Sequence, residues 1–204
     1  MSTELYHYHT IAQETEAEYT DRGSRFIAIA MPVESIAQFK EKLSVIKEKH
    51  PKASHFCFAY RMGADGMTFR STDAGEPSGT AGRPILGQID SKQITNVMVV
   101  VIRYFGGTLL GIPGLTQAYK VSASMALQLT TIIKKPIEIP YEIQFDYTVM
   151  NDVLQVLRSL QCTLLHQEMQ LFCSYHVGIP KQEEDECLLR LSKIPGLVSK
   201  KIQE

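Results

Sequence analysis

The sequence of 204 residues lacks the features that mark export, membrane insertion or a disulfide framework. Residues 1–7 contain neither a basic nor an apolar segment, so no secretory signal is predicted. No apolar run approaches the roughly 20 residues that cross a bilayer. We therefore expect a cytoplasmic protein with no membrane partner. The sequence also lacks Cys-x-x-Cys spacing, which favours free thiols over a zinc site for its four cysteines, Cys57, Cys162, Cys173 and Cys187.

Three motifs of phosphate and acyl chemistry are also missing. Neither the Walker pattern GxxxxGK[ST] nor the dinucleotide pattern GxGxxG occurs. The nucleophile elbow GxSxG is absent as well. The sequence therefore predicts no cofactor, no resident metal and no catalytic residue, and it favours a binding protein over an enzyme.

Residues 71–84 are the most distinctive segment that is present. They hold three glycines and two prolines between two well-patterned segments, Phe56–Arg61 and Val97–Tyr104. Such a mixture builds no regular helix or strand, and glycine lets a backbone approach a ligand closely. A second glycine-rich segment, Arg103–Gly107, echoes the first. We expect a shaped surface site on these loops.

The first loop is interpreted as a cradle for an anion. Ser78–Gly82 precedes a predicted helix, whose free N–H groups and dipole would favour a negative ligand. Arg83 at the helix start and Arg103 at the end of the neighbouring strand could both fork onto a phosphate. The expected ligand-binding or nucleic-acid-binding residues are His55, Arg61, Asp73, Glu76, Ser78, Gly79, Thr80, Gly82, Arg83, Arg103, Gly106 and Gly107.

Other interpretations of these residues stay open. The loop could be a turn in which Gly and Pro only satisfy geometry. A hydrolase would use His55 as base, Ser78 or Thr80 as nucleophile and Asp73 or Glu76 to orient the base. A metal site would use Asp73, Glu76 and His55. Tyr104 and Phe105 could stack on bases of single-stranded RNA, but anchoring the central strand in the core is favoured.

Charge is distributed unevenly along the chain. Residues 22–135 hold 15 Lys and Arg against seven Asp and Glu, a net charge of +8, whereas residues 136–204 carry −4. The basic part favours contact with phosphate or RNA, although an ordinary solvated surface could carry the same positive charge. The acidic part could dock a basic protein partner.

Hydrophobic periodicity predicts two α+β domains, residues 1–135 and 136–204. In the first, strands are expected at 25–30, 55–61, 67–70 and 96–102, and helices at 36–50, 80–89 and 115–129. The run from Asn96 to Ile102 is apolar enough for a central strand. In the second, the order of strands and helices is βαββαβ, with strands at 141–149, 163–167, 171–179 and 197–202, which is the ferredoxin-like plan. Each domain is expected to pack its helices on one face of a sheet.

Five segments together resemble one known family. Asp21–Ala28, His55–Arg61, Asp73–Pro84, Val101–Gly107 and Gly111–Tyr119 follow in order over residues 20–125 and are similar to the IMPACT/YigZ family. Ile112 and Pro113 depart from its pattern, where a further glycine is expected before Gly114.

The resemblance implies folds and a function. It implies that the first domain resembles the second domain of the fifth small-subunit ribosomal protein, and the second the last domain of elongation factor G. Eukaryotic relatives carry an additional domain, for which this chain has no room, and restrain the kinase pathway that senses amino-acid starvation by competing for its activator. That regulatory mechanism is therefore not expected to transfer whole to this chain. We therefore expect a translation-linked regulator that binds RNA, the ribosome or another phosphate-bearing ligand at the glycine loop. The alternatives are a small-molecule hydrolase or phosphate-ligand enzyme at the same loop, and a protein-interaction module without nucleic acid.

Overall fold

The computed structural model describes residues 5–169 and 172–202. These fall into two compact units, residues 8–135 and residues 136–202 together with 5–7. Residues 5–7 were expected in the first domain, but they group with the second, where the Ile137 N–H donates to the Tyr6 carbonyl at 2.8 Å. Leu171, expected at the start of a strand, lies outside the described residues.

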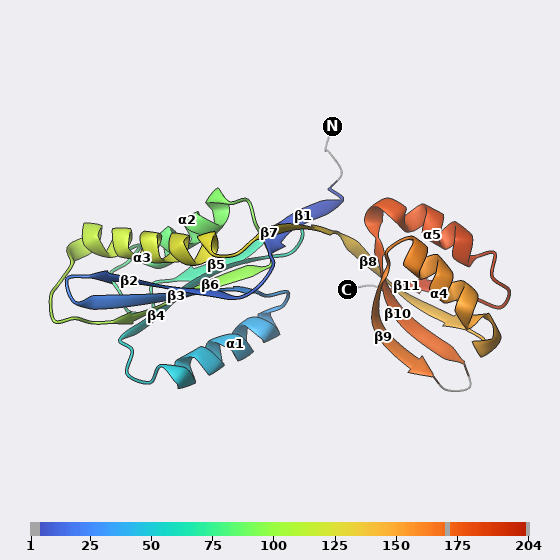
Figure 1. The fold of residues 1–204 in the computed structure, drawn as a ribbon, viewed down its shortest axis with the longest axis horizontal. Helices are drawn as coiled ribbons and strands as arrows, with labels where there is room; N and C mark the ends of the chain where they lie inside the picture. The colour runs from blue at the N-terminus through green and yellow to red at the C-terminus, as the bar shows by residue number, and fades with distance from the viewer. Residues whose placement is uncertain (1–4, 170–171, 203–204) are drawn as a thin grey trace. The chain divides into compact units, whose positions relative to one another are not determined.

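Five antiparallel strands form the main sheet of the first unit, in the order β2-β3-β6-β4-β5 (Figure 1). Their bounds are β2 (Thr15–Asp21), β3 (Ser24–Pro32), β4 (His55–Met62), β5 (Thr68–Thr72) and β6 (Val97–Tyr104). The central position of β6 is confirmed, because this strand is buried from Val97 to Arg103. A separate two-stranded sheet pairs β1 (His7–Ile11) with β7 (Ile132–Pro136).

Helices cover both faces of the five-stranded sheet (Figure 1). Helices α2 (Gly82–Ser91) and α3 (Gly111–Gln128) pack on one face, and α1 (Ile36–Lys49) packs on the other. Alternate residues of β6 point to opposite sides, with Val99 in the first core and Val100 in the second. The expectation of helices on one face is therefore wrong for this unit. An apolar run with no polar alternation must be covered on both sides.

The second unit has the expected βαββαβ order. Its elements are β8 (Glu138–Phe145), a 3₁₀ turn (Tyr147–Val149), α4 (Met150–Ser159), β9 (Thr163–Met169), β10 (Cys173–Pro180), a 3₁₀ turn (Lys181–Glu183), α5 (Glu184–Leu191) and β11 (Val198–Lys201). The strand order β11-β8-β10-β9, antiparallel throughout, confirms the ferredoxin-like plan. Both helices share one core with the sheet, which includes Val153, Leu157 and Leu191.

Within residues 5–169 and 172–202, no helix combines the length and the apolar character needed to cross a membrane.

Candidate functional site

Asp73 organises the glycine loop. It follows edge strand β5, and its carboxylate turns back onto the residues that begin α2. Oδ1 accepts from the backbone N–H groups of Ala81 at 2.9 Å and Gly82 at 2.8 Å, and Oδ2 accepts from Gly79 at 2.9 Å. The expected cradle of free N–H groups is therefore already occupied by a carboxylate of the chain itself. An incoming phosphate would have to displace Asp73 to use them.

The charge state of Asp73 follows from these bonds. Burial raises its pKa, but the three N–H donors of Gly79, Gly82 and Ala81, together with the positive charge of Arg83, outweigh burial and hold the pKa below its usual value. The carboxylate therefore stays ionised and works as a fixed cap for α2.

A buried ion pair joins the loop to the central strand. The Arg103 Nη1 donates to Glu76 Oε1 at 2.7 Å, and the side chains are 5% and 3% exposed. The Tyr119 hydroxyl of α3 donates to the same oxygen at 2.8 Å. The Arg103 guanidinium also lies over the ring of Phe105, 5.5 Å from its centroid. Arg103 is therefore not available at the surface as the sequence suggested, and it instead fixes the loop around Glu76.

One donor of Arg103 is left over. Its Nη2 donates to Ser24 Oγ at 3.3 Å, whereas its buried Nε has no hydrogen-bond partner among the described residues. A buried N–H without a partner is costly, and the bonds of the other two nitrogens to Glu76 and Ser24 hold Arg103 in place despite this cost.

His55 and Cys57 lie on β4 beside the same carboxylate. The His55 Nδ1 is 3.0 Å from the Ala74 carbonyl oxygen, and its Nε2 is 3.9 Å from Glu76 Oε1. The Cys57 sulfur lies 3.0 Å from the Asp73 carbonyl oxygen and 3.3 Å from the Tyr119 hydroxyl. Burial raises the pKa of the Cys57 thiol to about 12. Cys57 is therefore a protonated core thiol rather than a nucleophile.

Two glycines allow close backbone approaches that the site needs. A Cβ on Gly106 would lie 1.9 Å from the carbonyl carbon of Gly23, and one on Gly82 would lie 2.7 Å from the Thr72 nitrogen. The Gly106 N–H also donates to Ser24 Oγ at 3.2 Å. Gly106 thus lets the second glycine-rich loop lie against the β2–β3 turn, and Gly82 lets α2 lie against β5.

The two loops carry exposed groups of several kinds. Ser78, Arg83 and Gly107 are exposed, and Gly107 has a left-handed φ of 86°. Phe105 is 49% exposed, so the favoured expectation that it anchors the core is wrong. Tyr104 does anchor its strand, since its hydroxyl lies 2.9 Å from the His50 Nδ1. We call the exposed set Ser78, Arg83, Phe105 and Gly107 the glycine-loop surface.

Arg61 is not brought to this surface. In the β4–β6 register His55 faces Arg103, whereas Arg61 faces Val97 at the other end of the strand. Six residues of strand separate them, which is about 20 Å. Arg61 pairs with Asp90, with Nη2 2.8 Å from Oδ1, and lies over the Phe69 ring at 4.8 Å. It stabilises the distal end of the sheet.

The hydrolase arrangement is not assembled in this geometry. The Thr80 hydroxyl donates to the Pro77 carbonyl at 2.7 Å, and both oxygens of Asp73 are engaged by backbone N–H groups. No hydrogen bond joins His55 to Ser78 or Thr80 in the described part of the chain. Across the same residues, no group of three or more His, Cys, Asp and Glu side chains is placed to hold a metal ion.

Two contributors to the site, Tyr119 and Ser24, are not among the site residues predicted from the sequence. Tyr119 belongs to a segment that carries the family resemblance, and its phenol donates to Glu76. Ser24 likewise lies within the first such segment, and its buried hydroxyl bridges Arg103 and Gly106. A polar side chain at a buried position of a patterned helix or strand was the available signal, because such a group needs a partner.

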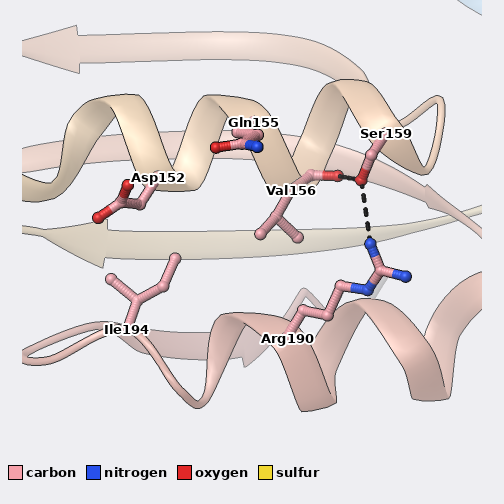
Figure 2. Close-up of a pocket in the computed structure, with 6 residues that line it drawn as sticks. All are labelled: Asp152, Gln155, Val156, Ser159, Arg190 and Ile194. Carbon is pink, nitrogen blue, oxygen red and sulfur yellow. Dashed lines mark hydrogen bonds between the residues drawn. The ribbon is translucent and has the colours of Figure 1, made fainter.

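A hollow of about 230 Å³ lies in the second unit, between α4 and α5 (Figure 2). The Arg190 side chain crosses it, and its Nη1 donates to Ser159 Oγ at 3.4 Å. The Nε of Arg190 donates to Glu186 at 2.6 Å. The hollow contains none of the residues predicted for the site; its lining consists of Asp152, Gln155, Val156, Ser159, Arg190 and Ile194.

The sequence of this chain is similar to those of known proteins. The model of the Impact N-terminal domain matches residues 22–127. The chain is 33% identical to the IMPACT family member YigZ of Escherichia coli over 174 residues, which cover 84% of this chain and 85% of that protein. It is 34% identical to the IMPACT family member YvyE of Bacillus subtilis over 160 residues, covering 78% and 74%.

A solved structure agrees over nearly the whole length. The crystal structure of a hypothetical protein, 27% identical, superposes with a TM-score of 0.77 and covers 98% of this chain and 100% of its own. The glycine loop, the Arg103–Glu76 pair and Tyr119 all lie within the matched residues 22–127. The chain belongs to the IMPACT family, with its Impact N-terminal domain at residues 22–127.

Proposed function

We propose that this protein is a translation-linked regulator that binds RNA or the ribosome through the glycine-loop surface. Membership of the IMPACT family supports a role in regulating translation. The observation that carries the RNA proposal is the exposure of a cation, a hydroxyl and an aromatic ring, on Arg83, Ser78 and Phe105, over two fixed loops.

The chemistry of this surface suits a single-stranded or looped nucleic acid. Arg83 can contact a phosphate in a bidentate manner, and the Phe105 ring can stack on a base whatever its sequence. The Arg103 guanidinium beneath Phe105 holds that ring from its buried side. Residues 22–135 carry a net charge of +8, which draws a polyanion toward the unit.

The two glycine-rich loops are held in place by contacts within the unit, and this rigidity favours affinity for a partner. Asp73 caps α2, and the Arg103–Glu76 pair ties the loop to the central strand. Gly82 and Gly106 let the two loops lie directly on neighbouring backbone. A surface already held in one conformation loses little entropy when a partner binds.

The test is binding of the purified protein to ribosomal subunits, transfer RNA and a single-stranded RNA, each at two salt concentrations. We expect binding that weakens steeply as salt rises, and a clear loss of affinity in an Arg83→Ala, Phe105→Ala double variant. Arg158→Ala is the matched control, because Arg158 is also exposed but lies on α4 of the second unit.

Two outcomes contradict the proposal. Absence of binding to all three nucleic acids at low salt removes RNA as the partner. Equal loss of binding in Arg158→Ala and in the double variant removes the glycine-loop surface as the site.

A protein partner is the second candidate. Leu109 is 82% exposed and Ile112 is 64% exposed at the start of α3, close in sequence to the glycine-loop surface, and exposed apolar groups of this kind mark protein contacts. Docking through the acidic second unit is weaker than the sequence suggested. Glu184 already pairs with Lys201, and Glu186 already pairs with Arg190.

The cytoplasmic location expected from the sequence stays a prediction.

A further inference from the structure

Two cysteines of the second unit lie in contact. The sulfur of Cys162 is 3.8 Å from the sulfur of Cys187. The other two cysteines are placed differently: Cys173 is buried in β10, and Cys57 lies on β4 of the first unit. All four are free thiols. A sulfur pair at this distance must approach by about 1.8 Å to form a disulfide bond.

The two thiols come from two neighbouring elements. Cys162 follows α4, and its N–H donates to the Leu157 carbonyl at 2.9 Å, which fixes it to the end of that helix. Cys187 lies in α5 and is fully buried, whereas Cys162 is only partly buried. Cys162 is therefore the more accessible residue of the pair.

We propose that Cys162 and Cys187 are a redox modification site, at which a hydroperoxide converts the two thiols into an intramolecular disulfide. Nothing about the glycine-loop surface enters this proposal, and it stands or falls independently of RNA binding. A pair made of an accessible thiol and an adjacent resolving thiol is the arrangement that gives a reversible product rather than over-oxidation.

The chemistry balances in two steps. The Cys162 thiolate attacks one oxygen of hydrogen peroxide, so that a sulfur–oxygen bond forms, the oxygen–oxygen bond breaks, and hydroxide leaves and takes a proton as water. The Cys187 thiolate then attacks the Cys162 sulfur, which forms the disulfide and expels a second hydroxide that also becomes water. Two thiols are oxidised, and one peroxide is reduced to two waters.

The surroundings shift the two thiols in opposite directions. A hydrogen bond from Cys162 lowers the pKa of Cys187 against the effect of burial, and the charge of Arg190 lowers it further. The same hydrogen bond and burial raise the pKa of Cys162. The attacking Cys162 thiolate therefore forms only when the shared proton passes to Cys187 across the 3.8 Å contact.

The disulfide would link the end of α4 to α5. These helices already meet through the Arg190–Ser159 hydrogen bond at the hollow of Figure 2. The cross-link closes a loop between residues 25 positions apart, which restricts the unfolded chain. Oxidation is therefore expected to raise the thermal midpoint of the second unit by roughly 5 °C or more.

The experiment uses the full chain. Reduced protein is treated with hydrogen peroxide under native conditions, remaining thiols are alkylated in denaturant, and peptides are mapped by mass spectrometry. We expect the four free thiols to fall to two, with a Cys162–Cys187 cross-linked peptide that dithiothreitol reverses. Cys173→Ala is the matched control: its three free thiols should fall to one, with the same Cys162–Cys187 cross-link. Cys162→Ala should abolish both the cross-link and the rise in thermal midpoint.

Several outcomes overturn the proposal. Four unreacted thiols, a sulfinic or sulfonic acid at Cys162 without the cross-link, or disulfides only between molecules would each do so. Peptide mapping of the unmodified sequence decides the matter even if a variant folds poorly.

Discussion

The Arg103 guanidinium and the Glu76 carboxylate form a buried ion pair between the central strand and the glycine loop, with 2.7 Å between Nη1 and Oε1. The Tyr119 hydroxyl completes the coordination of that carboxylate from α3. Three segments that are distant in sequence are thereby held at one point. The shape of the glycine-loop surface depends on this contact.

Removal of one charge from this pair should destabilise the first unit strongly. Glu76→Gln leaves the Arg103 charge buried without its counter-ion, at an expected loss of about 3 kcal/mol in the free energy of unfolding. Urea denaturation measures it.

An exposed ion pair supplies the control for this experiment. Glu18→Gln breaks the Arg25–Glu18 pair, whose side chains are 52% and 43% exposed, and should change stability little. Equal losses in Glu18→Gln and Glu76→Gln would contradict the structural role of the buried pair.

Asp73→Asn should remove a pH-dependent contribution to stability. The pKa of Asp73 is lowered on folding, so its contribution is fully present above the unfolded value of 3.8 and is lost as pH falls through the lower folded pKa. We expect the variant to be less stable by about 1–2 kcal/mol near neutral pH. The two proteins should converge in acid, because asparagine resembles the protonated carboxyl group. Denaturation curves at several pH values below and above 4 measure the difference in stability between the two proteins. A difference that stayed constant with pH would contradict this prediction.

The sequence predicted much of the fold because hydrophobic patterns are local. The apolar run of β6 indicated a central strand, and the βαββαβ order of the second unit followed from alternating patterns. The same run is buried on both faces, so helices must cover both, but helix periodicity does not reveal which face of a sheet each helix covers.

The site was less predictable because its geometry depends on contacts that are distant along the chain. The pattern identified a helix start rich in N–H donors, but not that Asp73 would occupy them. It identified Arg103 as a cation, but burial against Glu76 and Tyr119 is set by three separate elements. Phe105 and Tyr104 are adjacent in sequence, yet the end of β6 leaves one ring exposed and buries the other in part.

Gly106→Ala should be strongly destabilising. Its Cβ would overlap the backbone of Gly23 at 1.9 Å, and neither segment can move without breaking the bonds at Ser24. Overpacking of this severity should lower the free energy of unfolding by an amount on the order of 3 kcal/mol, or prevent folding. The thermal midpoint and the soluble yield measure it.

Gly87→Ala is the matched control for Gly106→Ala. Nothing lies within 4 Å of a Cβ at this helical position of α2, so alanine should be neutral or stabilising by up to about 1 kcal/mol. If Gly106→Ala behaved like Gly87→Ala, the close approach of the two backbones would be wrong.

The Cys57 thiol should be almost unreactive in the folded protein. With its pKa raised to about 12 by burial, roughly one molecule in ten thousand is a thiolate at pH 8. Alkylation of Cys57 by iodoacetamide, followed by peptide mapping, should be at least about 100-fold slower in native protein than in urea. Comparable rates in the two conditions would show that the loop opens readily above β4.

The salt dependence of RNA binding tests the central claim most directly. Affinity for one single-stranded RNA is measured over a series of salt concentrations for the unmodified protein, Arg83→Ala and Arg158→Ala. If Arg83 contacts a phosphate, its removal should reduce the slope of log affinity against log salt by about 1, while Arg158→Ala leaves the slope unchanged. Parallel slopes for all three proteins would contradict the assignment of the glycine-loop surface as the nucleic-acid site.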